Sequence, residues 1–197
     1  MPRSSQNIRV TYPVRVLAVC TGNVCRSPAV EWLLTTALAG DPAELQVVVA
    51  SRGTAALVGQ PISPPMGELL RSVGAPPGGF AATQLQPEVL ATAELVLTAT
   101  RAHRAAVVSM APSTVRRTFT VLEFAELAAH VPRGSLPGDD VASRLRALIV
   151  QAPAFRVAAQ RAADDIEDPW GLSDAVYRRC FDTIFGAVLT VVDAVAR

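Results

Sequence analysis

The chain has 197 residues, of which 50% are hydrophobic and 18% are charged, so it suits one domain with a full core and is not broadly disordered. Its 18 basic and 17 acidic residues give a net charge of +1, which argues against a broad nucleic-acid-binding surface. Three cysteines in a chain of this length are no disulfide scaffold and fit a reducing compartment. No signal peptide and no apolar run of about 18 residues is visible, so we expect a cytoplasmic protein without membrane contact.

Apolar, β-branched runs alternate along the chain with stretches of helical pattern. Ser27-Pro28 is a favourable helix start, because serine can cap a helix and proline suits its first turn. In chain order the sequence predicts a strand at 14–19, a helix at 28–38, a strand at 46–51, a helix at 64–73, a strand at 94–99, a helix at 100–110 and a strand at 118–122. The remainder is largely helical and ends in a long helix over about 173–196.

Strands that alternate with helices predict an α/β fold, a flavodoxin-like doubly wound sheet of about four parallel strands with helices on both faces. We expect residues 1–12 to form a flexible N-terminal segment and residues 13–197 to form a single domain. Ligands of such sheets bind where a strand ends and the next loop begins. The loop after the first strand is therefore the first candidate site.

That loop reads Cys20-Thr21-Gly22-Asn23-Val24-Cys25-Arg26-Ser27. Its residues from Thr21 to Ser27 can curve so that backbone N–H groups line an anion-binding nest, and the following helix adds its positive end. Gly22 permits the curvature, and the planar guanidinium of Arg26 can bind two phosphate oxygens. A cysteine in such a positive site is favoured as a thiolate, so Cys20 becomes a candidate nucleophile. A lone cysteine at a strand end would more often be a packing residue, but the whole constellation favours chemistry.

The segment VCTGNVCRSP around Cys20 closely resembles the signature of the low-molecular-weight protein tyrosine phosphatases. The resemblance continues in Ser51-Arg52-Gly53-Thr54, where Arg52 departs from an alanine common in the family, and it reaches an Asp-Pro pair near the C-terminus. It implies a phosphatase without metal or other cofactor, with phosphotyrosine-containing proteins or peptides as substrates and inorganic phosphate as product. Residues from about 125 to 163 match the family least. We expect them to be an insertion whose helices flank the site.

The resemblance also assigns a general acid. Expelling a phenolate needs a proton donor, which typically contributes roughly 10²–10⁴-fold. In the family an Asp-Pro pair supplies it, and Asp168-Pro169 is the matching pair, although a solvated acidic turn would explain Asp168 as well. In the implied cycle the Cys20 thiolate attacks phosphorus, Arg26 and the loop amides hold the oxygens, and Asp168 protonates the leaving oxygen and then activates water.

Residues outside this core set have weaker predictions. Trp170 is expected to form a wall of the substrate pocket by stacking on an aromatic ring. The family's second cysteine can form a reversible disulfide with the nucleophile, so that role and simple packing are both open for Cys25. Cys180 is expected in the core. Neither histidine lies in a metal-binding cluster, and His103 is expected at the surface rather than in the pocket.

Three other functions stay open. Thioredoxin-coupled arsenate reductases share the fold, but their relay needs further cysteines, and this chain has none between Cys25 and Cys180. Protein arginine phosphatases resemble the chain closely but carry threonine where Val24 stands, and the apolar side chain favours phosphotyrosine. A non-catalytic phosphate-binding module would keep the loop and lack turnover.

Overall fold

The computed structural model describes residues 12–38, 46–132, 134–157 and 165–196. Most of the expected N-terminal segment, residues 1–11, lies outside this description, which begins at the exposed Tyr12. Among the described residues, no helix combines the length and apolar character needed to cross a membrane.

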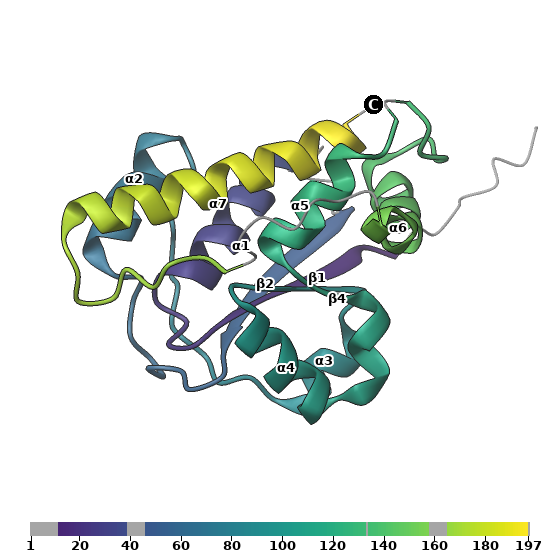
Figure 1. Cartoon of the computed structure of the whole chain (residues 1–197). Coiled ribbons are helices and arrows are strands. Elements are labelled where there is room, and N and C mark those ends of the chain that lie inside the picture. The colour runs from purple at the N-terminus through teal and green to yellow at the C-terminus, as the bar shows by residue number, and fades with distance from the viewer. Residues whose placement is uncertain (1–11, 39–45, 133, 158–164, 197) are drawn as a thin grey trace, which may run out of the picture.

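Four parallel strands form one sheet in the order β2-β1-β3-β4, which confirms the predicted flavodoxin-like architecture (Figure 1). The strands are β1 (Val14–Cys20), β2 (Val47–Gly53), β3 (Leu95–Thr98) and β4 (Thr118–Thr120). β1 is central and pairs with β2 along its whole length, from Val14 opposite Val47 to Cys20 opposite Gly53. The carboxyl ends of β1 and β2 therefore lie together.

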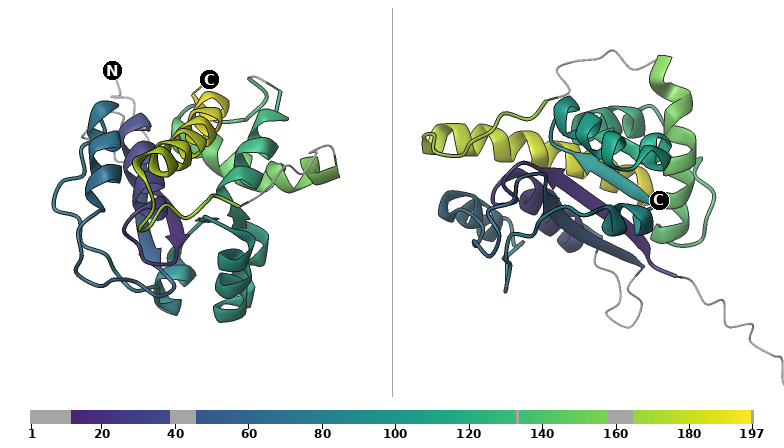
Figure 2. Two further views of the ribbon diagram at one scale, coloured as in Figure 1. Left: turned by 60° about the vertical axis from the view of Figure 1, so that its left-hand side comes forward. Right: turned by 90° about the horizontal axis from the view of Figure 1, so that it is seen from below.

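Helices cover both faces of the sheet (Figures 1 and 2). They are α1 (Arg26–Ala37), α2 (Pro64–Ser72), α3 (Pro87–Thr92), α4 (Arg101–Met110), α5 (Val121–Ala129), α6 (Val141–Gln151) and α7 (Asp174–Val195), with 3-10 turns at Pro112–Arg117 and Ala152–Val157. Because successive side chains of a strand point to opposite faces, β1 supplies two cores. Val16 and Ala18 pack with residues of α1, α2, α5, α6 and α7, whereas Leu17 and Val19 pack with residues of α3 and α4.

Most predicted boundaries differ from the structure by one or two residues, and two of these differences have a clear physical reason. α1 begins at Arg26 rather than Pro28, which then stands third in the helix. This is tolerated because the first four N–H groups of a helix have no internal partner, so proline loses nothing there. The strand predicted at 118–122 stops at Thr120, whose side chain caps α5 instead.

The expectation that residues 125–163 flank the site is wrong for α6. α6 packs at the amino-terminal end of the sheet, where Arg146 bonds the carbonyl of Tyr12 at 2.6 Å and forms an ion pair with Glu94 at 2.8 Å. Tyr12 and Glu94 lie just before β1 and β3, whereas Cys20 lies at the other end of β1. Whether the segment is an insertion atypical of the family stays a prediction.

Candidate active site

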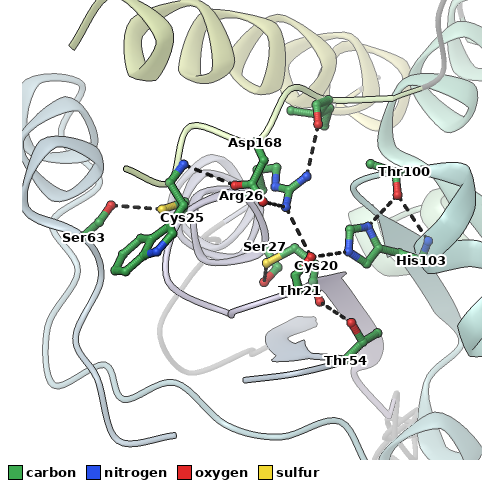
Figure 3. Close-up of polar contacts among 12 residues, drawn as sticks. Cys20, Thr21, Cys25, Arg26, Ser27, Thr54, Ser63, Thr100, His103 and Asp168 are labelled. Carbon is green, nitrogen blue, oxygen red and sulfur yellow. Dashed lines mark hydrogen bonds and ion pairs between the residues drawn. The ribbon is translucent and has the colours of Figure 1, made fainter. Parts of the chain in front are cut away.

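Cys20 is the last residue of β1, and the loop 21–25 leads from it into α1. Its side chain is buried, and its Sγ lies 3.0 Å from the Oγ of Ser27 in the first turn of α1 (Figure 3). The positive end of α1 therefore lies beside the thiol, as the sequence predicts.

The loop backbone is arranged as an anion-binding nest. The carbonyl oxygens of Cys20, Thr21 and Gly22 each accept a hydrogen bond from the segment after β2, at 2.9–3.0 Å. In the part of the chain that the structure describes, none of the amides from Thr21 to Cys25 donates a hydrogen bond to the protein. Free N–H groups in succession beside a helix N-terminus can bind the oxygens of an anion.

Two residues allow the loop its tight path. Asn23 has a φ of 56°, in the left-handed region that asparagine tolerates better than most residues. A Cβ atom at Gly53, which lies opposite Cys20 in the sheet, would collide with the carbonyl oxygen of Thr21. Glycine at this position thus lets the loop pack against β2.

A hydrogen-bond network behind the loop fixes its shape. Asn23 donates both protons of its amide, to the Oγ of Ser27 at 3.0 Å and to the Oγ of Ser51 at 2.8 Å, and its Oδ1 accepts from the amide of Thr83. Ser51 in turn donates to the Oε2 of Glu31 at 2.5 Å. Burial raises the pKa of Glu31 above its ordinary value, against the lowering effect of this hydrogen bond. The network runs through Ser27 to the Cys20 thiol.

Arg26 is almost wholly buried and binds three partners. Its Nη1 donates to the carbonyl of Ile166 at 3.2 Å, and its Nη2 donates to the Oδ2 of Asp168 at 2.5 Å and to the Oγ1 of Thr21 at 3.5 Å. Its Nε is buried without a partner among the described residues. An unpaired buried donor costs about 1–3 kcal/mol of stability, and a ligand oxygen bonded to this N–H would remove that cost.

Asp168 reaches the site from a segment more than 140 residues away in the sequence. The amide of Ile166 donates to the carbonyl of Ala99, just after β3, at 2.9 Å, which ties the segment to the sheet. The Asp168 side chain is half exposed and points at Arg26 (Figure 3). The carboxyl group predicted as the general acid therefore faces Arg26, the side chain predicted to bind phosphate.

A pocket of about 160 Å³ brings most of the predicted site together. Its walls are Cys20, Thr21, Gly22, Val24, Cys25, Arg26, Ala55, Leu57, Asp168 and Trp170. Asn23 and Ser27 do not line it, because their side chains are buried in the network behind the loop. The predicted wall residue Trp170 does, and apolar Leu57 joins it.

Cys25 is held by hydroxyl groups rather than paired with another thiol. Its Sγ lies 3.2 Å from the Oγ of Ser63 and 3.7 Å from the hydroxyl of Tyr177 in α7. Burial raises the pKa of the Cys25 thiol, and it raises the pKa of Cys180 to about 12. Cys180 is a core residue, as predicted, and all three cysteines are free.

The expectation of a surface position for His103 is wrong. Its ring is 8% exposed and lies between Thr21, at 2.9 Å from Nε2, and Thr100, at 2.7 Å from Nδ1 (Figure 3). Burial lowers the pKa of His103, and the nearby charge of Arg26 lowers it further. The sequence signal was its position three residues after Thr100, the spacing at which a capping threonine meets the first turn of a helix.

Sequence reasoning missed Glu31 and Ser63, which support the loop from α1 and from the residue before α2. Neither stands in a recognisable motif, and their partners are 20 and 38 residues away. In the described parts of the chain, no group of three or more His, Cys, Asp or Glu side chains is placed to hold a metal ion. The site thus offers a thiol, a guanidinium, a carboxyl group and free amides.

Residues 15–134 match the family model of the low molecular weight phosphotyrosine protein phosphatases. The chain is 32% identical over 117 residues to a probable low molecular weight protein-tyrosine-phosphatase, EpsP, of Ralstonia solanacearum, covering 59% of this chain and 77% of the relative. A low molecular weight protein tyrosine phosphatase from T. tengcongensis has a similar structure, with a TM-score of 0.64 and 28% identity over 91% of this chain and 98% of that one. YwlE arginine phosphatase from Geobacillus stearothermophilus has a TM-score of 0.65 and 26% identity, over 92% of each chain.

The fold and the loop at the end of β1 define a phosphatase of the hydrolase class. The chain belongs to the low molecular weight protein-tyrosine-phosphatase family.

Proposed function

We propose that the protein hydrolyses phosphotyrosine and other aryl phosphate monoesters through a phosphocysteine intermediate on Cys20. The observation that carries the proposal is the convergence of Cys20, Arg26 and Asp168 on one pocket beside a run of free amides. A phosphate of the substrate would accept from these amides and from Arg26, whose buried Nε has no other partner among the described residues.

The first step transfers phosphorus to sulfur. The Cys20 thiolate attacks phosphorus, an S–P bond forms, the P–O bond to the leaving group breaks, and Asp168 gives its proton to the departing oxygen. Ser27 accepts a hydrogen bond from Asn23, and its own proton can go to the Cys20 sulfur at 3.0 Å or to the carbonyl of Arg52 at 3.4 Å. Donation to the nearer sulfur, which carries the negative charge, stabilises the thiolate. Substrate must also compete with Asp168 for Nη2 of Arg26, which releases the carboxyl group towards the leaving oxygen.

The second step hydrolyses the intermediate. Asp168, now a carboxylate, takes a proton from water, whose oxygen attacks phosphorus while the S–P bond breaks and the thiolate returns. Arg26 and the amides carry the negative charge of the equatorial oxygens in both steps. Trp170 and Leu57 supply an apolar wall for an aromatic leaving group.

Hydrolysis of p-nitrophenyl phosphate under reducing conditions tests the mechanism. Cys20→Ser should abolish turnover, and Asp168→Asn should lower kcat by roughly 10²–10⁴-fold. Glu167→Gln is the matched control, because Glu167 is an exposed carboxylate one residue away that pairs with Arg179 instead. Absence of turnover in the folded wild type would refute the proposal, and equal activity of Asp168→Asn and Glu167→Gln would refute the role of Asp168.

Phosphoarginine is a second candidate substrate, because a protein described as an arginine phosphatase is among the similar structures. Val24 lines the pocket and offers the guanidinium of such a substrate no hydrogen bond. We therefore expect a higher kcat/KM for phosphotyrosine peptides than for phosphoarginine peptides of the same sequence. Val24→Thr should shift the ratio towards phosphoarginine, and a wild-type preference for phosphoarginine would reverse the assignment.

A further inference from the structure

His103 joins two threonine hydroxyl groups across the rim of the pocket. Its Nδ1 lies 2.7 Å from the Oγ1 of Thr100, and its Nε2 lies 2.9 Å from the Oγ1 of Thr21 (Figure 3). Thr100 precedes α4 and Thr21 follows β1, so the ring bridges two segments of the active-site edge. None of the proposed chemical steps uses this histidine.

The surroundings of Thr100 determine the direction of the hydrogen bonds. The Oγ1 of Thr100 already accepts from the backbone amide of His103 at 3.2 Å. Among the described residues, the only acceptor within reach of its hydroxyl proton is Nδ1 of the ring. If Thr100 donates to Nδ1, a neutral ring carries its proton on Nε2 and donates it to Thr21.

The charges around the ring favour this neutral form. The groups that act on His103 are Arg26 of α1, which lowers its pKa, and Asp168 and Asp165, which raise it less. Burial of the ring has the largest effect and lowers the pKa as well. Neutral imidazole is therefore the form present near neutral pH.

Thr21 then has one proton left to give. Its Oγ1 accepts from Nε2 of His103 and, at 3.5 Å, from Nη2 of Arg26. With both acceptor positions occupied, the hydroxyl proton must point elsewhere, and Thr21 is exposed and lines the pocket. We propose that His103 is a positioning residue that orients the Thr21 hydroxyl to donate to an oxygen of the phosphate bound in the pocket. This inference rests on the proposed function for the identity of the ligand.

Side-chain replacements can separate orientation from structural support. Thr21→Val removes the donor, and Thr21→Ser keeps it. His103→Phe removes both ring hydrogen bonds, whereas the amide of His103→Gln can reach the Nε2 position and still donate to Thr21. Each variant is compared with the wild type for kcat/KM on p-nitrophenyl phosphate, for the Kd of inorganic phosphate by calorimetry, and for its melting temperature.

We expect Thr21→Val and His103→Phe each to lower kcat/KM and weaken phosphate binding roughly 10–100-fold, the usual effect of one hydrogen bond to a charged group. The double variant should lose no more than Thr21→Val alone, because the histidine acts only through the threonine. His103→Gln and Thr21→Ser should stay within about threefold of the wild type, because both keep the donor.

Losses that multiply in the double variant, or a His103→Gln variant as impaired as His103→Phe, would overturn the inference. Unchanged phosphate affinity in Thr21→Val would overturn it as well. If the wild type binds phosphate without hydrolysing the ester, the proposed function fails, and the phosphate affinities of the variants still decide the role of His103.

Discussion

Gly53 shows how a single missing side chain sets the geometry of the site. A Cβ there would collide with the carbonyl oxygen of Thr21, which accepts from the amide of Ala55, and with Ala56, whose amide donates to the side chain of Gln84. Neither neighbour is the end of a flexible side chain, so relief requires movement of the backbone.

We therefore predict that Gly53→Ala lowers the free energy of unfolding by about 1–3 kcal/mol, the usual cost of overpacking, and lowers kcat for p-nitrophenyl phosphate with it. Urea denaturation and steady-state kinetics measure the two effects. Gly78→Ala is the control, since nothing lies within 4 Å of a Cβ at Gly78. Equal stability of the two variants would show that the loop backbone can move to accept the Cβ atom without a loss of stability.

Glu31, in the hydrogen-bond network behind the loop, should make the stability of the protein depend on pH. Burial raises its pKa above the ordinary value of 4.5, so the folded protein holds the proton more tightly than the unfolded chain. The stability that comes from this group is fully present below its unfolded pKa and is lost as pH rises through the folded pKa. Ser51 donates to Glu31, and a glutamine oxygen can accept the same bond.

Glu31→Gln cannot ionise, so its free energy of unfolding relative to the wild type should rise as the pH increases from 4.5, the ordinary pKa, through the raised pKa of the folded state. Urea denaturation across this range measures the difference. A difference that stays constant with pH would mean that Glu31 ionises equally in the folded and unfolded states.

At the site, the sequence predicted the residues whose chemistry is marked by their immediate neighbours. The loop from Cys20 to Ser27 carries its chemistry in consecutive positions, and Asp168 is marked by its proline. The contact of His103 with Thr100 follows a local capping pattern, but its contact with Thr21, 82 residues away, is encoded by no local pattern and could not be predicted.

At the scale of elements, the junction between β4 and α5 shows a conflict between two local signals. Residues 118–122 have the β-branched pattern of a strand, but Thr120 and Glu123 form a capping box in which each side chain bonds the other's backbone amide. The capping box prevails and the strand ends after three residues. A Thr three residues before a Glu is visible in the sequence and could have identified this boundary.

Thr120→Ala should accordingly lower the free energy of unfolding by about 0.5–2 kcal/mol, because it removes the acceptor for the amide of Glu123. Thr183→Ala, on the exposed side of α7, is the matched control and should be neutral or slightly stabilising, because alanine favours helices. Chemical denaturation distinguishes the two. A Thr120→Ala variant as stable as the wild type would mean that packing of α5 alone fixes its start.

The alternation of strands and helices predicted the sheet, but its short elements were less visible. α3 has six residues and α6 lies in a segment without a clear start signal other than Asp140, whose side chain accepts from the amide of Ser143. A short helix has too few residues to show a period of 3.6, so only its packing defines it.

The whole molecule brings three distant segments to one edge of the sheet. The loop after β1, the start of α4 and the segment before α7 meet there, and Arg26 bonds residues of the first and third segments (Figure 3). In parallel sheets the carboxyl ends of all strands lie at the same edge, so this convergence follows from the topology. The α6 helix packs at the opposite edge of the sheet and takes no part in this convergence.

A ligand that binds several segments at once should stabilise the whole fold. A ligand that binds only the folded state at 100 times its Kd adds about 2.7 kcal/mol to the free energy of unfolding. For a chain of this size, about 1 kcal/mol raises the melting temperature by roughly 2–4 °C. We predict a phosphate-dependent rise of this size in the wild type, measured by calorimetry at constant ionic strength with sodium chloride as the reference salt.

Arg26→Lys should show much less of this rise at the same phosphate concentrations. Lysine keeps the positive charge but loses the planar fork, and with it the unpartnered Nε and the bond to the carbonyl of Ile166. If charge alone attracted the anion, the two proteins would respond equally. A smaller response in the lysine variant, with the same effect of sodium chloride on both melting temperatures, would show that the directed hydrogen bonds of Arg26, and not its charge alone, bind the phosphate.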